Sequence, residues 1–109
     1  MAKKNIYFKY EMLILTILSQ GDYYGYEITS KIKKLTDNFI DVKAGILYPS
    51  LYKMLDKGYI TSEDVLINRK IRVYYHLTDT GKDYLEKTIS EYYEWERKIN
   101  NVLDTIQLK

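Results

Sequence analysis

Apolar residues recur at the spacing of an α-helix in three successive segments of the chain. The first segment consists of Tyr10, Leu13, Ile14, Ile17 and Leu18, and Gln20-Gly21-Asp22 ends it. The second begins near Tyr26 and consists of Ile28, Ile32, Leu35 and Phe39. The third consists of Leu47, Leu51, Met54 and Leu55, and Lys57-Gly58 is a typical C-terminal cap for it. These spacings predict three amphipathic helices.

The start of the third helix stays open between two positions. A start near Ala44 puts Pro49 in the second turn, where it removes one backbone hydrogen bond. A start near Tyr48 puts Pro49 at the first helical position, which proline favours.

The pattern changes to alternation in the segment that follows. Val73, Tyr75 and Leu77 alternate with Arg72, Tyr74 and His76, which is typical of a half-buried strand. Residues 60–67 are its expected partner strand, and Asn68-Arg69-Lys70 is the tip between them, where Asn tolerates the positive φ of a tight turn. Three helices followed by a hairpin predict a winged helix-turn-helix, a mainly α fold with a small β-hairpin.

A long final helix is predicted after the hairpin. Thr78 is a suitable N-cap, and residues 79–107 contain no breaker except Gly81, which corresponds to a helix about 43 Å long. An apolar seam at heptad spacing runs along it and consists of Leu85, Ile89, Tyr92, Trp95, Ile99, Val102, Leu103 and Ile106. Such a seam favours pairing with the same helix of a second chain; folding back on the chain's own core is the alternative. We divide the chain into a winged helix-turn-helix domain, residues 1–77, and a dimerisation helix, residues 78–109.

Composition argues against several classes of function. With no cysteine and one histidine, the chain lacks the ligands of most zinc sites and the residues of a catalytic triad, and neither a metal nor a cofactor is expected. Without a serine nucleophile motif, a phosphate loop or paired carboxylates, an enzyme is not expected. No apolar run is long enough for a membrane span or a secretory signal, so a cytoplasmic location without membrane contact is expected.

Charge is distributed unevenly along the chain. The net charge is +2; residues 1–77 carry 12 basic and 8 acidic side chains, and residues 78–109 carry 5 and 7. A basic N-terminal part favours an anionic partner there, although many protein surfaces share such a balance.

Four short motifs resemble those of the PadR family of bacterial transcriptional regulators, in the same order and spacing. They are Tyr24-Gly25-Tyr26-Glu27-Ile28, Gly45-Ile46-Leu47-Tyr48-Pro49 with Leu51 and Leu55, Gly58-Tyr59-Ile60, and Tyr74-Tyr75-His76-Leu77-Thr78 with Gly81. With a single C-terminal helix, the chain looks like the short subfamily, which includes multidrug-responsive repressors. The resemblance implies a homodimeric repressor that binds palindromic operator DNA and is released by small aromatic ligands.

Candidate DNA-binding residues lie on the third helix and the hairpin. On a helical wheel Tyr52 and Lys53 point away from the apolar face, and at the hairpin tip Arg69 and Arg72 flank Lys70, where arginine suits a narrow minor groove. The full set is Lys43, Gly45, Tyr48, Pro49, Tyr52, Lys53, Arg69, Lys70 and Arg72. An ordinary solvated surface is the alternative. Because the exposed face of the third helix has no Arg, Asn or Gln, DNA shape is expected to contribute more than direct base contacts.

Two features depart from the family pattern. The hairpin tip has no glycine, and the best counterpart of the tryptophan pair in drug-binding members is Tyr92, with Trp95 one turn further along. In a symmetric dimer, these rings either stack on their copies or hold an aromatic ligand between them. A function of another class stays open: a winged-helix adaptor that binds another protein and whose heads do not bind DNA.

Overall fold

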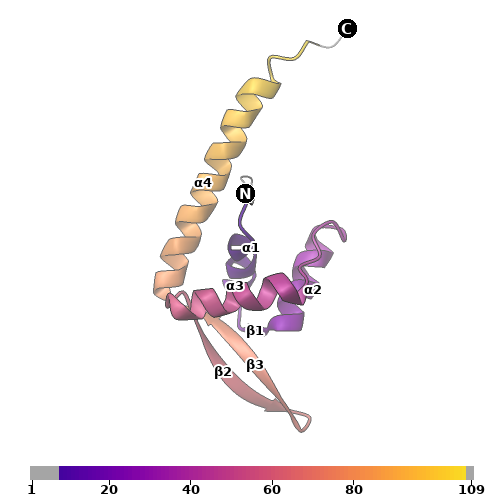
Figure 1. Cartoon of the computed structure of the whole chain (residues 1–109), viewed down its shortest axis with the longest axis vertical. Helices are drawn as coiled ribbons and strands as arrows, with labels where there is room; N and C mark the ends of the chain where they lie inside the picture. The colour runs from indigo at the N-terminus through magenta and orange to yellow at the C-terminus, as the bar shows by residue number, and fades with distance from the viewer. Residues whose placement is uncertain (1–7, 108–109) are drawn as a thin grey trace.

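The computed structural model describes residues 8–107 and contains the predicted helices and hairpin (Figure 1). The helices are α1 (Tyr10–Leu18), α2 (Gly25–Leu35), α3 (Ala44–Asp56) and α4 (Asp79–Leu103). The strands are β1 (Tyr23–Tyr24), β2 (Ile60–Ile67) and β3 (Lys70–Leu77). The first three helices form a compact head, the β2–β3 hairpin extends from one end of it, and α4 extends from the other (Figure 1). The molecule measures 63 × 32 × 29 Å along its principal axes.

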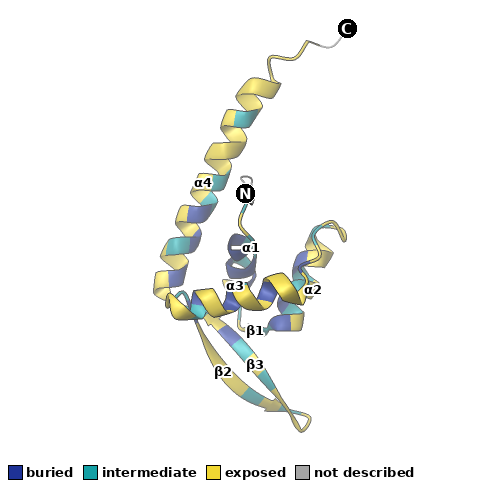
Figure 2. Ribbon diagram, viewed as in Figure 1, coloured by how far each residue is buried: buried dark blue, intermediate teal, exposed yellow. Residues whose placement is uncertain are grey.

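The helix α1 is the centre of the hydrophobic core. It contacts α2, α3 and α4, and this explains why Met12 and Leu15, which lie outside the predicted apolar stripe, are buried together with Ile14. From α3, Leu51 and Met54 pack into the same core and are fully buried (Figure 2). The head is therefore held together around one central helix.

The short strand β1 was not predicted from the sequence. Tyr23 pairs with Tyr75 and Tyr24 pairs with Tyr74, so the sheet has three antiparallel strands in the order β1-β3-β2. A strand of two residues shows no alternation in sequence, and only the pairing with β3 identifies it. The pairing places the start of α2 beside the hairpin.

The hairpin turn is tighter than predicted. Ile67 pairs with Lys70, so the turn contains only Asn68 and Arg69, whose φ values are 49° and 67°. Two successive residues with positive φ are typical of a type I′ turn, which matches the twist of the flanking strands. Lys70 therefore belongs to β3, and Arg69 adopts a left-handed conformation without glycine.

The buried apolar stripe of the second helix is shorter than the sequence pattern predicts. It ends at Leu35, and the prediction that Leu35 and Phe39 belong to its core-facing stripe is wrong, because these side chains are 71% and 88% exposed. Asp37 and Asn38 have positive φ and turn the chain away from the helix axis, so Phe39 does not continue the helical spacing.

The long helix α4 starts as predicted and ends earlier. The Thr78 hydroxyl accepts a hydrogen bond from the Gly81 backbone N–H at 3.0 Å, and a Cβ at Gly81 would overlap the Tyr59 carbonyl oxygen. The predicted helical end at residue 107 is wrong: α4 ends at Leu103, so Ile106 lies outside the helix. Within the described residues, no helix is both long enough and apolar enough to span a membrane.

Candidate nucleic-acid interface

The outer face of α3 carries most of the residues predicted to contact DNA. Because α3 begins at Ala44, Pro49 lies in its second turn, which settles the alternative left open by the sequence. Tyr52 is 61% exposed on the outer face, and Tyr48, at 38% exposed, lies at the edge of that face. Gly45 and Pro49 are exposed on the same outer side. These residues share one surface of α3.

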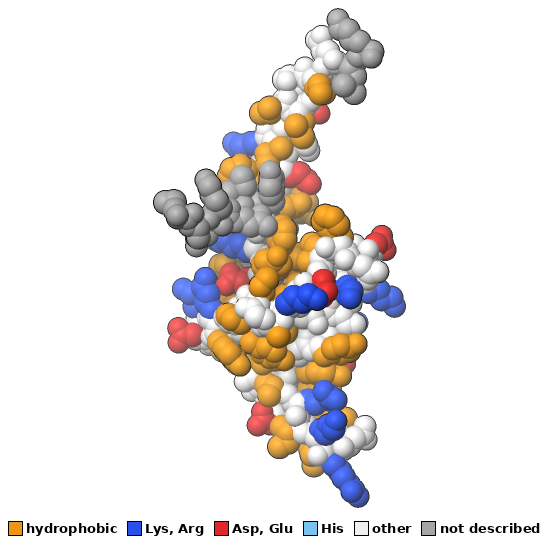
Figure 3. Space-filling model, turned by 45° about the vertical axis from the view of Figure 1, so that its right-hand side comes forward, with side chains coloured by type: hydrophobic (Ala, Val, Ile, Leu, Met, Phe, Trp, Pro, Cys, Tyr) orange, Lys and Arg blue, Asp and Glu red, His pale blue; other side chains and the backbone are white. Residues whose placement is uncertain are grey.

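The hairpin carries the second group of predicted residues. Arg69 and Lys70 are exposed at its end, where Lys and Arg side chains gather (Figure 3). Arg72 is half-buried, and its guanidinium carbon lies 4.6 Å from the centre of the Tyr24 ring. This cation–π contact restrains the Arg72 side chain, whereas the two residues at the tip lie open to solvent.

Lys43 is paired with an acid of its own chain. Its Nζ atom lies 2.8 Å from Asp41 Oδ2, and Lys33 Nζ lies 3.8 Å from the same oxygen. The hydrogen bond from Lys43, followed by the attraction of Lys33, lowers the pKa of the exposed Asp41 carboxyl. A phosphate at the start of α3 would compete with Asp41 for Lys43.

Lys53 is paired with a buried acid that sequence reasoning missed. Its Nζ atom lies 3.5 Å from Glu11 Oε2, and the Tyr84 hydroxyl donates a hydrogen bond to Glu11 Oε1 at 2.8 Å. Glu11 is 9% exposed, at the start of α1, and the Tyr59 and Tyr84 rings stack with centres 4.2 Å apart. A carboxylate at the start of an otherwise apolar helix was the available sequence signal. Lys53 is thus linked to α1 and α4 as well as to the outer face of α3.

The single histidine lies beside an aspartate on the surface. His76 Nδ1 is 2.9 Å from Asp22 Oδ1, and both side chains are more than half exposed. Among residues 8–107, no three His, Cys, Asp or Glu side chains lie close enough together to hold a metal ion.

The predicted seam on α4 divides into two parts. Leu85 is 6% exposed within the chain's own core, so its expected contact with a partner helix is wrong for this residue. Ile89 and Tyr92 pack partly against the core and line a groove of about 320 Å³ with residues of α1. Further along, the exposed seam residues are Trp95, Val102, Leu103 and Ile106, with Ile99 half-buried (Figure 2).

Comparison with known proteins gives the family of this head-and-helix arrangement. The sequence model of one protein family, described as the transcriptional regulator PadR-like family, matches residues 14–87. The chain belongs to the PadR-like family of transcriptional regulators. This confirms the resemblance carried by the four motifs, and the family consists of transcription regulators and not of enzymes.

Individual PadR-like relatives agree with the match. The negative transcriptional regulator PadR of Bacillus subtilis (strain 168) is 38% identical over 73 residues, which are 66% of this chain and 40% of that protein. The chain thus corresponds to 40% of the length of that regulator. The structure of a transcriptional regulator from Clostridium thermocellum has a TM-score of 0.79 at 33% identity and covers 84% of this chain and 89% of that chain.

A further solved structure is that of Bacillus subtilis PadR in complex with operator DNA. It has a TM-score of 0.66 at 35% identity and covers 72% of this chain and 45% of that chain. Together with the Clostridium thermocellum structure, it confirms the predicted winged-helix fold with a long C-terminal helix in this PadR-like protein.

Replacing Tyr84 with Phe tests the Glu11–Tyr84 contact. We expect Y84F to lower the free energy of unfolding by about 1–2 kcal/mol, because the buried Glu11 carboxylate loses a hydrogen-bond donor. Urea unfolding at one protein concentration measures the change. The matched control is Y93F, since Tyr93 is 57% exposed and removal of its hydroxyl leaves the core unchanged.

The contribution of Tyr84 to the free energy of unfolding depends on pH. Burial, followed by the hydrogen bond to Glu11, raises the pKa of Tyr84 from 10.0 to about 12. The folded-state pKa is therefore above the unfolded one, so the contribution is complete below about pH 10 and is lost as the pH rises towards 12. The stability difference between wild type and Y84F should narrow over that interval. An equal decrease in the free energy of unfolding in Y84F and Y93F would contradict a stabilising Glu11–Tyr84 hydrogen bond.

Proposed function

We propose that this protein is a transcriptional repressor that binds a palindromic operator as a homodimer and is released by a small aromatic effector. The observation that carries the DNA-binding part is the shared fold with Bacillus subtilis PadR, which has been solved in complex with operator DNA. In this chain the same fold presents an open α3 face and a hairpin with a cationic tip.

Each head is proposed to place α3 in the major groove and the hairpin in the neighbouring minor groove. A dimer would set two α3 helices about one helical turn, roughly 34 Å, apart on the duplex. Arg69 and Lys70 are the exposed cations of the hairpin tip, whereas Lys43 and Lys53 are already paired with Asp41 and Glu11. The hairpin is therefore expected to supply more of the phosphate attraction than α3.

The outer part of α4 supports dimerisation. Trp95, Val102 and Leu103 are 46%, 68% and 58% exposed on a helix that projects beyond the head (Figure 1). Exposed apolar residues along one helix are stabilised when a second helix covers them. The second copy of α4 is the proposed partner, with Tyr92 and Trp95 of both chains facing each other across the axis.

Removing the two cations of the tip tests the DNA-binding proposal. We expect R69A/K70A to weaken binding to duplex DNA and to reduce the salt dependence of the affinity, since each lost phosphate contact lowers the slope of log K against log salt by about 0.9. Fluorescence anisotropy with a labelled duplex at several salt concentrations measures both quantities.

The matched control for charge is R97A/K98A. It removes one arginine and one lysine from α4, where both side chains pair with Glu94. If both double variants bind DNA like the wild type, the hairpin does not contact DNA. If the wild type binds no duplex even at low salt, the protein-binding adaptor replaces the repressor as the proposed function.

Adding a charge to the seam tests dimerisation. We expect V102E to shift the protein from dimer to monomer at micromolar concentration, because a carboxylate would be buried between the paired helices. Sedimentation velocity measures the change, and N101E is the control, since it adds the same charge at an exposed position beside the seam. A wild-type monomer at this concentration would contradict the proposal.

The effector site is tested through the single tryptophan. We expect planar aromatic compounds to quench Trp95 fluorescence in the wild type and to have a much weaker effect on the V102E monomer, because the proposed site lies between two copies. Lack of quenching across a broad panel of compounds would refute aromatic effector binding at this site.

A further inference from the structure

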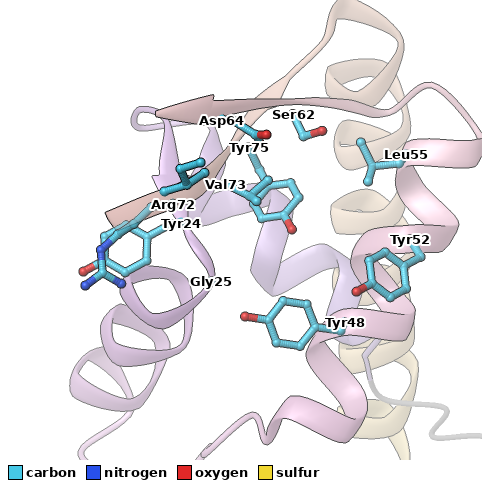
Figure 4. A pocket seen from close by; sticks show the side chains of 11 residues that line it. Tyr24, Gly25, Tyr48, Tyr52, Leu55, Ser62, Asp64, Arg72, Val73 and Tyr75 are labelled. Carbon is cyan, nitrogen blue, oxygen red and sulfur yellow. The ribbon is translucent and has the colours of Figure 1, made fainter. Parts of the chain in front are cut away.

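An open cleft of about 510 Å³ lies between the outer face of α3 and the sheet. Four tyrosine rings line it: Tyr48 and Tyr52 from α3, Tyr24 from β1, and Tyr75 from β3 (Figure 4). Arg72 of β3 lies at its edge. We call it the tyrosine cleft. It joins the two surfaces, α3 and hairpin, that are proposed above to enter neighbouring grooves.

Three tyrosine hydroxyls of the cleft have no hydrogen-bond partner in the part of the chain that the structure describes. Within residues 8–107, no hydrogen bond is formed by the hydroxyls of Tyr48, Tyr52 or Tyr75. The Tyr75 residue is only 4% exposed, and its hydroxyl points into the space that also receives the Tyr48 hydroxyl (Figure 4). Burial, followed by the proximity of Tyr48 and Tyr52, raises the pKa of Tyr75. The cleft therefore offers several converging donors.

The positions of these donors are restrained by packing. A Cβ at Gly25 would lie 2.7 Å from the Tyr48 hydroxyl, so the glycine leaves room for it at the start of α2. Tyr48 and Tyr52 lie one helical turn apart with ring centres separated by 6.2 Å. At the edge of the cleft, the Arg72 guanidinium lies over the Tyr24 ring, on the face of the sheet opposite Tyr75. Such restraint lowers the entropy lost when a ligand is bound.

We propose that the tyrosine cleft binds a backbone phosphate of one DNA strand, with the hydroxyls of Tyr48, Tyr52 and Tyr75 as donors. This inference rests on the proposed function. A strand that separates a major groove occupied by α3 from a minor groove occupied by the hairpin passes between these two elements. Phosphate oxygens accept hydrogen bonds from tyrosine hydroxyls, and such contacts fix the orientation of a protein on the duplex.

The carboxylate of Asp64 also lines the cleft, and its removal tests whether the bound group is negatively charged. Asp64 of β2 shares a sheet face with Val73 and Tyr75, whereas Glu63 lies on the opposite face of the same strand. A phosphate in the cleft is repelled by Asp64, so D64N should raise DNA affinity more than E63Q does. Both substitutions remove one negative charge from β2, and a general charge effect would change the two affinities equally.

The decisive experiment removes hydroxyls singly. Y48F, Y52F and Y75F are each expected to weaken duplex binding about five-fold at constant salt, because each loses one hydrogen bond to phosphate. Y93F is the control, since Tyr93 lies on α4 and is not among the residues that line the tyrosine cleft. Circular dichroism and thermal unfolding identify any variant whose loss of affinity comes from loss of fold.

The outcomes separate this inference from the proposed function. Wild-type binding that is unchanged in all three cleft variants overturns the phosphate site and leaves DNA binding intact. Absence of wild-type binding overturns both. Sodium phosphate should displace the duplex more strongly than sodium chloride at equal ionic strength, because free phosphate competes for the cleft, and this difference should be lost in Y48F and Y52F. Equal displacement of the wild type by the two salts would contradict the phosphate site.

Discussion

The burial of α1 by the helices around it is the constraint on which the other elements depend. Because α2, α3 and α4 each pack against this one helix, the position of α3 and the direction of α4 are set by the same core. Ile14 and Leu15 are completely buried at its centre. A displacement of α4 relative to α1 would therefore reach α3 through close-packed side chains, without a flexible joint between them.

A second, polar connection runs alongside this apolar one. Glu11 of α1 accepts a hydrogen bond from Tyr84 of α4 and pairs with Lys53 of α3, so one buried carboxylate joins three helices. Lys53 is consequently part of the frame of the head as well as of its outer face. The cations of the hairpin tip have no such structural role and remain available to a charged partner.

The helix α4 combines two environments along its length. Leu85 and Thr88 lie in the core of the head, whereas Val102 and Leu103 are exposed on the projecting part. A heptad pattern in sequence does not distinguish these parts, since both need apolar residues at the same spacing. The distance from the head decides which residues are covered within the chain and which are left for a second copy.

Local sequence patterns were sufficient to predict the three head helices, the hairpin and the Thr78 cap, because these depend on residues close together in the chain. The tertiary structure decided the rest. It placed Leu85 inside the core, paired Tyr24 with Tyr74, and brought Glu11 to Tyr84, 73 residues away. The tyrosine cleft likewise combines side chains from separate elements. Contacts of this kind depend on how helices and strands pack against each other, and the spacing of apolar residues within one element carries no information about them.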